Sequence, residues 1–265
     1  MQFKIVISLL CIMFLQSNFA LTQSDPSASH GNTIVQQGLL LLGKPYVVGT
    51  LDTGDKEQLT YSSSMFDCVT FVEYVLASSY ANRSESIKRD LNFEYYLKQY
   101  RYHHGEIDGY GSRIHYFSQW IEQFVKNKFG KNITIELGGV LYRKRIDYMT
   151  TNKSIYPKLT DAYAYNKILQ AEKEMSAYPL MYIPSGSISE AVSGIQNGDI
   201  IAITTDIKGL DIVHTGFAFW KNNQLYLLHA SSDYKKVMIS REPLVDYITK
   251  NPHQNGIIVV RPVMP

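Results

Sequence analysis

The sequence predicts an α+β fold, with helices in the first two thirds of the chain and an antiparallel sheet in the last third. Before Pro179, apolar residues recur at helical spacing in several segments. Beyond Pro179, short apolar runs alternate with turn residues, which is typical of strands. Helical segments followed by a series of strands indicate an α+β protein rather than alternating β and α units.

Composition places the chain among ordinary globular proteins. Its 265 residues are 45% hydrophobic, and 26 Lys and Arg against 24 Asp and Glu give a net charge of +2. This balance excludes a disordered chain and a strongly basic protein that binds nucleic acid. The 20 tyrosines are unusual. Because tyrosine has an apolar face and a polar tip, they suit a wet groove as well as a core.

Residues 1–20 predict a signal peptide. Lys4 precedes an apolar run from Ile5 to Leu15, and small and polar residues follow as far as Ala20. The run is shorter than the roughly 20 residues that span a bilayer, and no other segment is apolar enough to do so. We therefore expect an exported protein that does not span a membrane. Cleavage would leave Cys68 as the only cysteine, a thiol that is either buried or used.

Several helices are expected between the signal peptide and Pro179. Residues 21–30 are read as a polar tether, and 31–265 as one catalytic domain. One helix is predicted to begin at Asp67 or Cys68, because Val69, Val72 and Val75 follow at helical spacing. The other predicted helices are 33–42, a segment after Ser84, 112–129 and 161–175, and residues 133–146 are predicted to be extended with a bend at 138–139.

The last third predicts five strands. Between the second and third, Lys221-Asn222-Asn223 is a turn signal that indicates a hairpin. The predicted strands are 199–204, 212–220, 224–229, 236–240 and 256–263.

Three side chains suggest nucleophilic catalysis. Cys68 stands at a helix start, where unpaired backbone N–H groups favour the thiolate. His214 and His229 lie on the two strands of the predicted hairpin, so neighbouring strands can bring them side by side. A thiolate, a base and a polar group that orients the base form the arrangement that nucleophilic catalysis needs. Taken singly, a histidine in an apolar strand is more often a core residue, and only the combination with Cys68 favours catalysis.

The ordered motifs resemble the NlpC/P60 cell-wall hydrolases. They are Gly43-Lys44-Pro45-Tyr46, Asp67-Cys68, Gly198-Asp199-Ile200-Ile201, His214-Thr215-Gly216-Phe217-Ala218 and Leu228-His229-Ala230-Ser231-Ser232. Gly111-Ser112-Arg113-Ile114-His115-Tyr116-Phe117 further resembles the DUF1460 branch, the N-acetylmuramoyl-L-alanine amidase-like proteins. This resemblance implies a papain-like fold, with the nucleophile helix packed on an antiparallel sheet.

The resemblance also implies the roles of individual residues. Cys68 would be the nucleophile, His214 the general base and His229 the group that orients His214. Tyr46 would help the oxyanion, and Asp67 would contact substrate. No metal and no cofactor is implied.

Two departures from the common family pattern bear on specificity. γ-D-glutamyl-diamino-acid endopeptidases have a serine after the cysteine, whereas this chain has Val69. The resemblance therefore favours cleavage between N-acetylmuramic acid and L-Ala, with the endopeptidase as the alternative.

The second departure is the long segment between Cys68 and His214, which implies a mostly helical insertion at 84–179 beside the cleft. Such an insertion suits soluble peptidoglycan fragments (muropeptides), including 1,6-anhydro forms.

The insertion offers residues for substrate binding. A helix from Ser112 would place Arg113 and Tyr116 on one face. Arg113 would then donate to a carboxylate or carbonyl of the ligand, and His115 belongs to the same motif. The alternative for Arg113 is an ion pair with an acidic neighbour. Packing is the alternative for the aromatic residues.

Other classes remain open at this point. A zinc amidase would cut the same bond, but the chain lacks His-Glu-x-x-His. A non-catalytic muropeptide-binding module would use the tyrosines and leave Cys68 idle. An acyltransferase has related Cys-His chemistry, but nothing in the sequence indicates a lipid groove. We expect a monomeric periplasmic or cell-surface enzyme.

Overall fold

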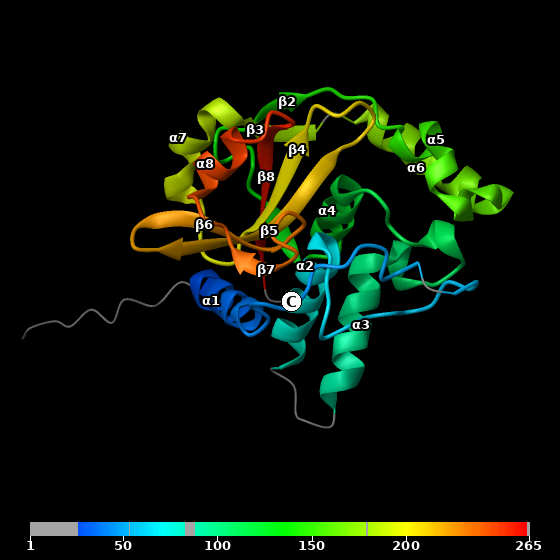
Figure 1. Ribbon diagram of the computed structural model, residues 1–265, viewed down its shortest axis with the longest axis horizontal. Coiled ribbons are helices and arrows are strands. Elements are labelled where there is room, and N and C mark those ends of the chain that lie inside the picture. Colours follow the sequence, from blue (N-terminus) through cyan, green and yellow to red (C-terminus); the bar gives the residue numbers. More distant parts are fainter. Residues whose placement is uncertain (1–25, 53, 83–87, 179, 264–265) are drawn as a thin grey trace, which may run out of the picture.

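The computed structural model describes residues 26–52, 54–82, 88–178 and 180–263, so the predicted signal peptide lies outside the described residues. Figure 1 shows one antiparallel sheet with helices on both sides. The α+β prediction is confirmed. The helices are α1 (Pro26–Leu39), α2 (Cys68–Ala81), α3 (Arg89–Arg101), α4 (Phe117–Lys126), α5 (Tyr148–Thr151), α6 (Ala162–Ala177), α7 (Ile188–Ala191) and α8 (Leu244–Thr249).

The strands pair in the order β2-β3-β8-β4-β5-β6-β7, and β1 also pairs with β8. Asn222 and Asn223 adopt the left-handed conformation between β5 and β6, which is the hairpin predicted from the sequence. The strands are β1 (Gly130–Asn132), β2 (Val140–Tyr142), β3 (Leu180–Pro184), β4 (Ile200–Thr205), β5 (Ile212–Lys221), β6 (Gln224–Ser231), β7 (Lys236–Ile239) and β8 (Gln254–Pro262).

Alternate residues of the strands build a core on each face of the sheet. On β4, Ile200 and Ala202 pack with buried residues of α2 and α4, such as Phe71. Ile201 and Ile203 pack on the other face with Leu244 of α8 and with α7. Figure 1 shows α7 and α8 on the side of the sheet opposite α1 and α2. The sheet is therefore covered on both faces.

The segment 84–179, predicted to be an insertion, pairs and packs with the sheet. It contributes α3 to α6 and the strands β1 and β2, which pair with β8 and β3. A third apolar cluster joins Tyr116 to Met149 of α5 and Ile168 of α6. Among the described residues, no helix has the length and apolar character needed to cross a membrane.

Several predicted boundaries are wrong. Helix α1 begins at Pro26, inside the segment predicted to be a tether. Helix α4 begins at Phe117 rather than at Ser112, because the Ile114 N–H donates to the Arg101 carbonyl instead of continuing a helix. Strand β2 covers only a small part of the segment 133–146 that was predicted to be extended, and β3 and α8 were not predicted.

Candidate active site

Cys68 is the first residue of α2, and a capping box fixes the start of this helix. Asp67 Oδ1 accepts a hydrogen bond from the Thr70 backbone N–H at 2.8 Å, and Thr70 Oγ1 accepts one from the Asp67 N–H at 2.9 Å. The predicted helix start is confirmed. The sulfur is thereby held at the helix N-terminus, with the Thr215 backbone N–H of β5 hydrogen-bonded to it.

His214 and His229 lie on β5 and β6 and hydrogen-bond to each other. His214 Nε2 is 2.6 Å from His229 Nδ1, and the two rings are nearly perpendicular. Both side chains are buried. The pairing of β5 with β6 brings them together, as the hairpin predicted.

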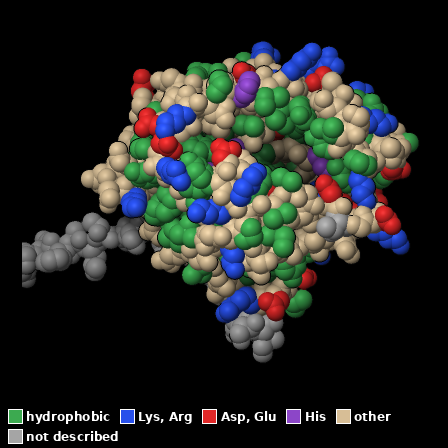
Figure 2. Space-filling view, viewed as in Figure 1, with side chains coloured by type: hydrophobic (Ala, Val, Ile, Leu, Met, Phe, Trp, Pro, Cys, Tyr) green, Lys and Arg blue, Asp and Glu red, His purple; other side chains and the backbone are tan. Residues whose placement is uncertain are grey.

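Cys68 and His214 line the same cavity, which has a volume of about 100 Å³. Its walls come from α2, from the segment that leads into α4, and from the beginning of β5. They include Val69, Ile114, His115, Tyr116, Phe117, Trp120, Leu210, Asp211, Ile212, Val213 and Thr215. The structure thus brings a thiol and an imidazole to one small cleft. Figure 2 shows the surface of one face of the molecule, which is hollowed near its centre.

The thiol and the imidazoles favour their neutral forms. Burial and the neighbouring Asp67 charge raise the pKa of Cys68 to about 12, although the backbone N–H groups of Thr215, Cys68 and Val69 act in the opposite direction. Burial lowers the pKa of His214 to about 4 and that of His229 to about 2. The expectation of a resting thiolate at the helix start is therefore wrong, because burial outweighs the helix N–H groups.

Tyr46 forms an isolated β-bridge with Phe66, two positions before Cys68. Burial raises the pKa of its hydroxyl, and the negative charges of Cys68 and Asp67 act in the same direction. The Tyr46 backbone N–H donates to the carbonyl of Lys235, which joins this segment to the turn after β6. The role predicted for Tyr46 at the oxyanion stays a prediction.

The predicted substrate residues occupy different environments. Tyr116 and His115 line the cavity of Cys68. The Tyr116 hydroxyl donates to Glu172 and accepts from the Met149 N–H, so only its ring is available to a ligand. Burial lowers the pKa of His115 to about 3. His115 Nε2 lies 2.9 Å from the Tyr110 carbonyl oxygen, which can only accept a hydrogen bond. The proton of the neutral imidazole is therefore on Nε2, and Nδ1 is an acceptor.

Arg113 does not lie on a helix with Tyr116, so the predicted shared face is wrong. Its backbone is extended, and its side chain has a relative exposure of 6%. The guanidinium donates to the Leu51 carbonyl at 3.0 Å and forms ion pairs with Asp52 and Glu57. The geometry corresponds to the alternative weighed above, an ion pair with acidic neighbours, here in the segment 51–57.

Three further side chains near the site were not predicted. Asp211, three positions before His214, is buried in the cavity wall and accepts from the Ser118 N–H at 2.7 Å, which caps the first turn of α4. Asp233 lies on the turn after β6, and its charge raises the pKa of His214. The ring of Tyr247 on α8 contacts both imidazoles. Only Asp211 had a signal in the sequence, as an isolated acid at the start of the His214 strand.

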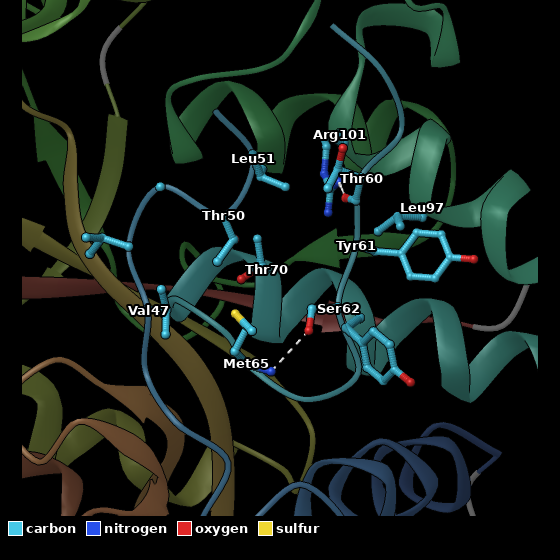
Figure 3. A pocket seen from close by; sticks show the side chains of 13 residues that line it. Val47, Thr50, Leu51, Thr60, Tyr61, Ser62, Met65, Thr70, Leu97 and Arg101 are labelled. Atoms are coloured by element: carbon cyan, nitrogen blue, oxygen red, sulfur yellow. Dashed lines mark hydrogen bonds between the residues drawn. The ribbon is translucent and has the colours of Figure 1, made fainter. Parts of the chain in front are cut away.

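Neighbouring cavities add no metal site. In the described part of the chain, no three side chains of His, Cys, Asp or Glu are arranged to hold a metal ion. A cavity of about 280 Å³ lies between the segments 47–51 and 60–65, over Thr70 of α2 (Figure 3). Its one charged lining residue, Arg101, is paired with Glu73 and donates to the Thr60 carbonyl. This cavity therefore offers an uncharged surface.

A comparison with protein families gives a match over most of the chain. Residues 36–257 match the family described as N-acetylmuramoyl-L-alanine amidase-like. The chain belongs to this family. Comparison with curated proteins gives no match.

Solved structures agree with membership of the amidase-like family. An N-acetylmuramoyl-L-alanine amidase from Bacteroides uniformis is 35% identical, over 89% of this chain and 99% of its own, with a TM-score of 0.84. A Bacteroides fragilis protein described as a candidate xylanase is 33% identical, over 85% of this chain and 99% of its own, with a TM-score of 0.80. A DUF1460 protein from Legionella pneumophila is 25% identical, over 89% of each chain, with a TM-score of 0.64.

These matches confirm the resemblance to the amidase-like DUF1460 proteins. Together, the family and the neighbours named as amidases assign the chain to the cell-wall amidases.

Proposed function

We propose that this cell-wall amidase is a cysteine enzyme that hydrolyses the amide between N-acetylmuramic acid and L-Ala in soluble muropeptides, including 1,6-anhydro forms. The observation that carries the proposal is the hydrogen bond of 2.6 Å between His214 Nε2 and His229 Nδ1, with His214 and Cys68 on one cavity. We further propose that the predicted export signal directs the enzyme out of the cytoplasm.

The hydrogen bond between the imidazoles determines how His214 can act as a base. If His214 donates its Nε2–H to His229 Nδ1, the Nδ1 of His214 carries a lone pair that can accept the thiol proton. His229 then carries its own proton on Nε2. In the opposite tautomer His214 would carry its proton on Nδ1 and could not act as a base there. Catalysis therefore requires His229 as the acceptor.

Both groups start neutral, so the proton moves during attack. The sulfur of Cys68 bonds to the amide carbonyl carbon while the thiol proton passes to His214. The N–H groups at the start of α2 and the Tyr46 hydroxyl stabilise the oxyanion. The C–N bond then breaks, His214 returns its proton to the departing L-Ala nitrogen, and a thioester remains. Water hydrolyses the thioester to a muramic carboxylate and regenerates the thiol.

Val69 supports the amidase over the endopeptidase. Its side chain lines the cavity beside Cys68 and cannot accept or donate a hydrogen bond. It therefore cannot help to bind a free L-Ala ammonium group, which an endopeptidase substrate presents. Insertion residues 114–117 lie on the wall of the same cavity. We infer that they favour small soluble fragments over a crosslinked wall.

Mass spectrometry of digested muropeptides tests the proposal. We expect wild-type enzyme to release free tripeptide or tetrapeptide together with the sugar, faster from soluble fragments than from intact walls. Release of an L-Ala–D-Glu dipeptide would instead make the chain an endopeptidase. No turnover of any muropeptide would favour a binding module.

Variants at the site test the mechanism. Cys68→Ala and His214→Ala should abolish turnover with the fold intact, and iodoacetamide should inactivate the enzyme where EDTA does not. His253→Ala is the matched control, because His253 is an exposed histidine that pairs with Asp206. Near-normal turnover by Cys68→Ala would make the thiol structural and would overturn the proposal.

A further inference from the structure

His229 is not fully held by its hydrogen bonds. Its Nδ1 contacts His214, but within the described residues its buried Nε2 has no hydrogen-bond partner. A ring with one hydrogen bond can still tilt about that bond. A residue that orients the base must itself be oriented, so another contact has to supply this restraint.

The ring of Tyr247 is placed to supply it. The centroid of this ring lies 5.3 Å from that of His229 at an interplanar angle of 76°, and 6.4 Å from that of His214 at 41°. Edge-on contacts at such distances are favourable and depend on the relative orientation of the rings. The edge-on contact is the one with His229, so Tyr247 is placed to restrain that imidazole.

The helix α8 fixes the position of this ring. Leu244 and Ile248, on either side of Tyr247 in sequence, are fully buried in the core above the sheet. The Tyr247 N–H donates to the Pro243 carbonyl at 2.9 Å. Burial raises the pKa of the Tyr247 hydroxyl, and the charges of Asp233 and Cys68 act in the same direction, whereas a hydrogen bond with the Gln254 side chain acts in the opposite direction. The ring is thus anchored from the core side and reaches the site.

We propose that Tyr247 is a positioning residue, whose ring holds His229, and through it His214, in the orientation needed for proton transfer with Cys68. The proposal rests on the function proposed above. It assigns the effect to the flat ring and not to the hydroxyl.

Two substitutions separate the ring from the hydroxyl. Tyr247→Phe keeps the ring, so we expect a kcat within about twofold of wild type. Tyr247→Leu keeps an apolar side chain at this half-buried position but removes the flat ring, so we expect kcat to fall about tenfold or more, with KM within about twofold. Tyr163→Leu, at an exposed tyrosine of α6, is the matched control. A loss of more than about tenfold in Tyr247→Phe would transfer the role to the hydroxyl and overturn the proposal.

A double-mutant cycle with His229→Ala gives the decisive readout. If Tyr247 acts through His229, adding Tyr247→Leu to His229→Ala should lower kcat by less than about twofold further. If the kcat losses of Tyr247→Leu and His229→Ala multiply in the double variant, Tyr247 does not act through His229 and the proposal is overturned. An unchanged kcat in Tyr247→Leu alone would overturn it as well. Thermal melting of each variant identifies loss of fold. Turnover that survives Cys68→Ala would instead refute the proposed function, which keeps the two failures distinct.

Discussion

Cys68 and His214 illustrate how burial can reverse an expectation drawn from local geometry. The start of a helix favours a thiolate, and the nearby N–H groups do lower the pKa of Cys68. Burial and the Asp67 carboxylate have the larger effect, so the thiol stays protonated at neutral pH. His214 is kept neutral by burial as well. The resting pair is therefore a thiol and a base rather than an ion pair.

This neutral pair predicts the pH dependence of turnover. His214 must be neutral to accept a proton, and its pKa of about 4 lies below the ordinary 6.5. We expect kcat/KM to persist below pH 6.5 and to fall as His214 becomes protonated near pH 4. Asp233→Asn should shift this limb to lower pH, because the Asp233 charge raises the pKa of His214. An acid limb at pH 6.5 or above, with the fold intact, would contradict the neutral pair.

Arg113 is expected to stabilise the segment 51–57. Arg113→Ala would leave Glu57, with a side-chain exposure of 6%, without its cation, so we expect a loss of about 1–3 kcal/mol in the free energy of unfolding. Chemical denaturation measures this loss. Asp52→Asn should cost less, since Asp52 is 53% exposed. If Arg113→Ala instead raises KM with no change in the free energy of unfolding, Arg113 contacts substrate directly, as the sequence predicted.

At the scale of single elements, the start of α2 links stability to the proposed catalysis. The capping box holds Cys68 at the first helical position, so fraying of this turn would move the proposed nucleophile. Asp161 caps α6 in a similar way, by accepting from the Ala164 N–H at 2.8 Å. The two caps therefore provide a matched pair, one at the site and one away from it.

We expect Asp67→Ala and Asp161→Ala each to lower the free energy of unfolding by about 1 kcal/mol, the usual cost of losing a cap. Only Asp67→Ala should also reduce kcat, because Cys68 follows its cap. Asp67→Asn keeps a side-chain oxygen that can accept from the Thr70 N–H but removes the negative charge. This variant therefore tests whether substrate binding needs the charge of Asp67. If Asp67→Ala has the same kcat as wild type, the capping box is not needed for turnover and this prediction is wrong.

Elements were predictable from the sequence where their signals are local. The start of α2 follows from Asp67 and the apolar spacing after it, and the β5–β6 hairpin follows from the asparagine turn. The start of α4 was missed because the Ile114 N–H is taken by a carbonyl of α3, distant in sequence. The helix α8 has only six residues, which is too short a segment to show a helical period.

The same distinction applies to the candidate site. Cys68, His214 and His229 stand in motifs that can be read along the chain, and the structure brings them to one region. Tyr247 and Asp233 have no such motif. Their place near the site follows only from how α8 and the turn after β6 pack against the sheet. Their roles depend on neighbours that the sequence does not specify.

For the whole molecule, a buried ion pair joins α2 to the segment 84–179. Glu73 of α2 and Arg101 of α3 are 2.7 Å apart with side-chain exposures of 2% each, and Arg101 also donates to the Thr60 carbonyl. The Trp120 indole of α4 donates to Glu73 at 3.3 Å. One carboxylate therefore connects three helices.

Arg101→Met should leave this carboxylate buried without a cation, at a cost of about 3–5 kcal/mol in the free energy of unfolding. Lys131→Met removes an exposed ion pair with Glu136 and should have an effect of less than about 1 kcal/mol. Thermal or denaturant unfolding compares the two. If both variants lose a similar free energy of unfolding, burial does not make the Glu73–Arg101 pair more important to stability than an exposed pair.

The two strands of the insertion shield the sheet from other molecules. Strand β1 pairs with residues 260–262 of β8, and β2 pairs with β3, so both cover backbone that would otherwise present open N–H and C=O groups. Such edges invite strands of a second chain. The outermost strand β2 is short, and Arg143, Lys144 and Arg145 follow it within three positions, a pattern of charge that opposes further pairing. Removing 84–179 would therefore open these edges to other chains, in addition to removing the core side chains of α3 and α4.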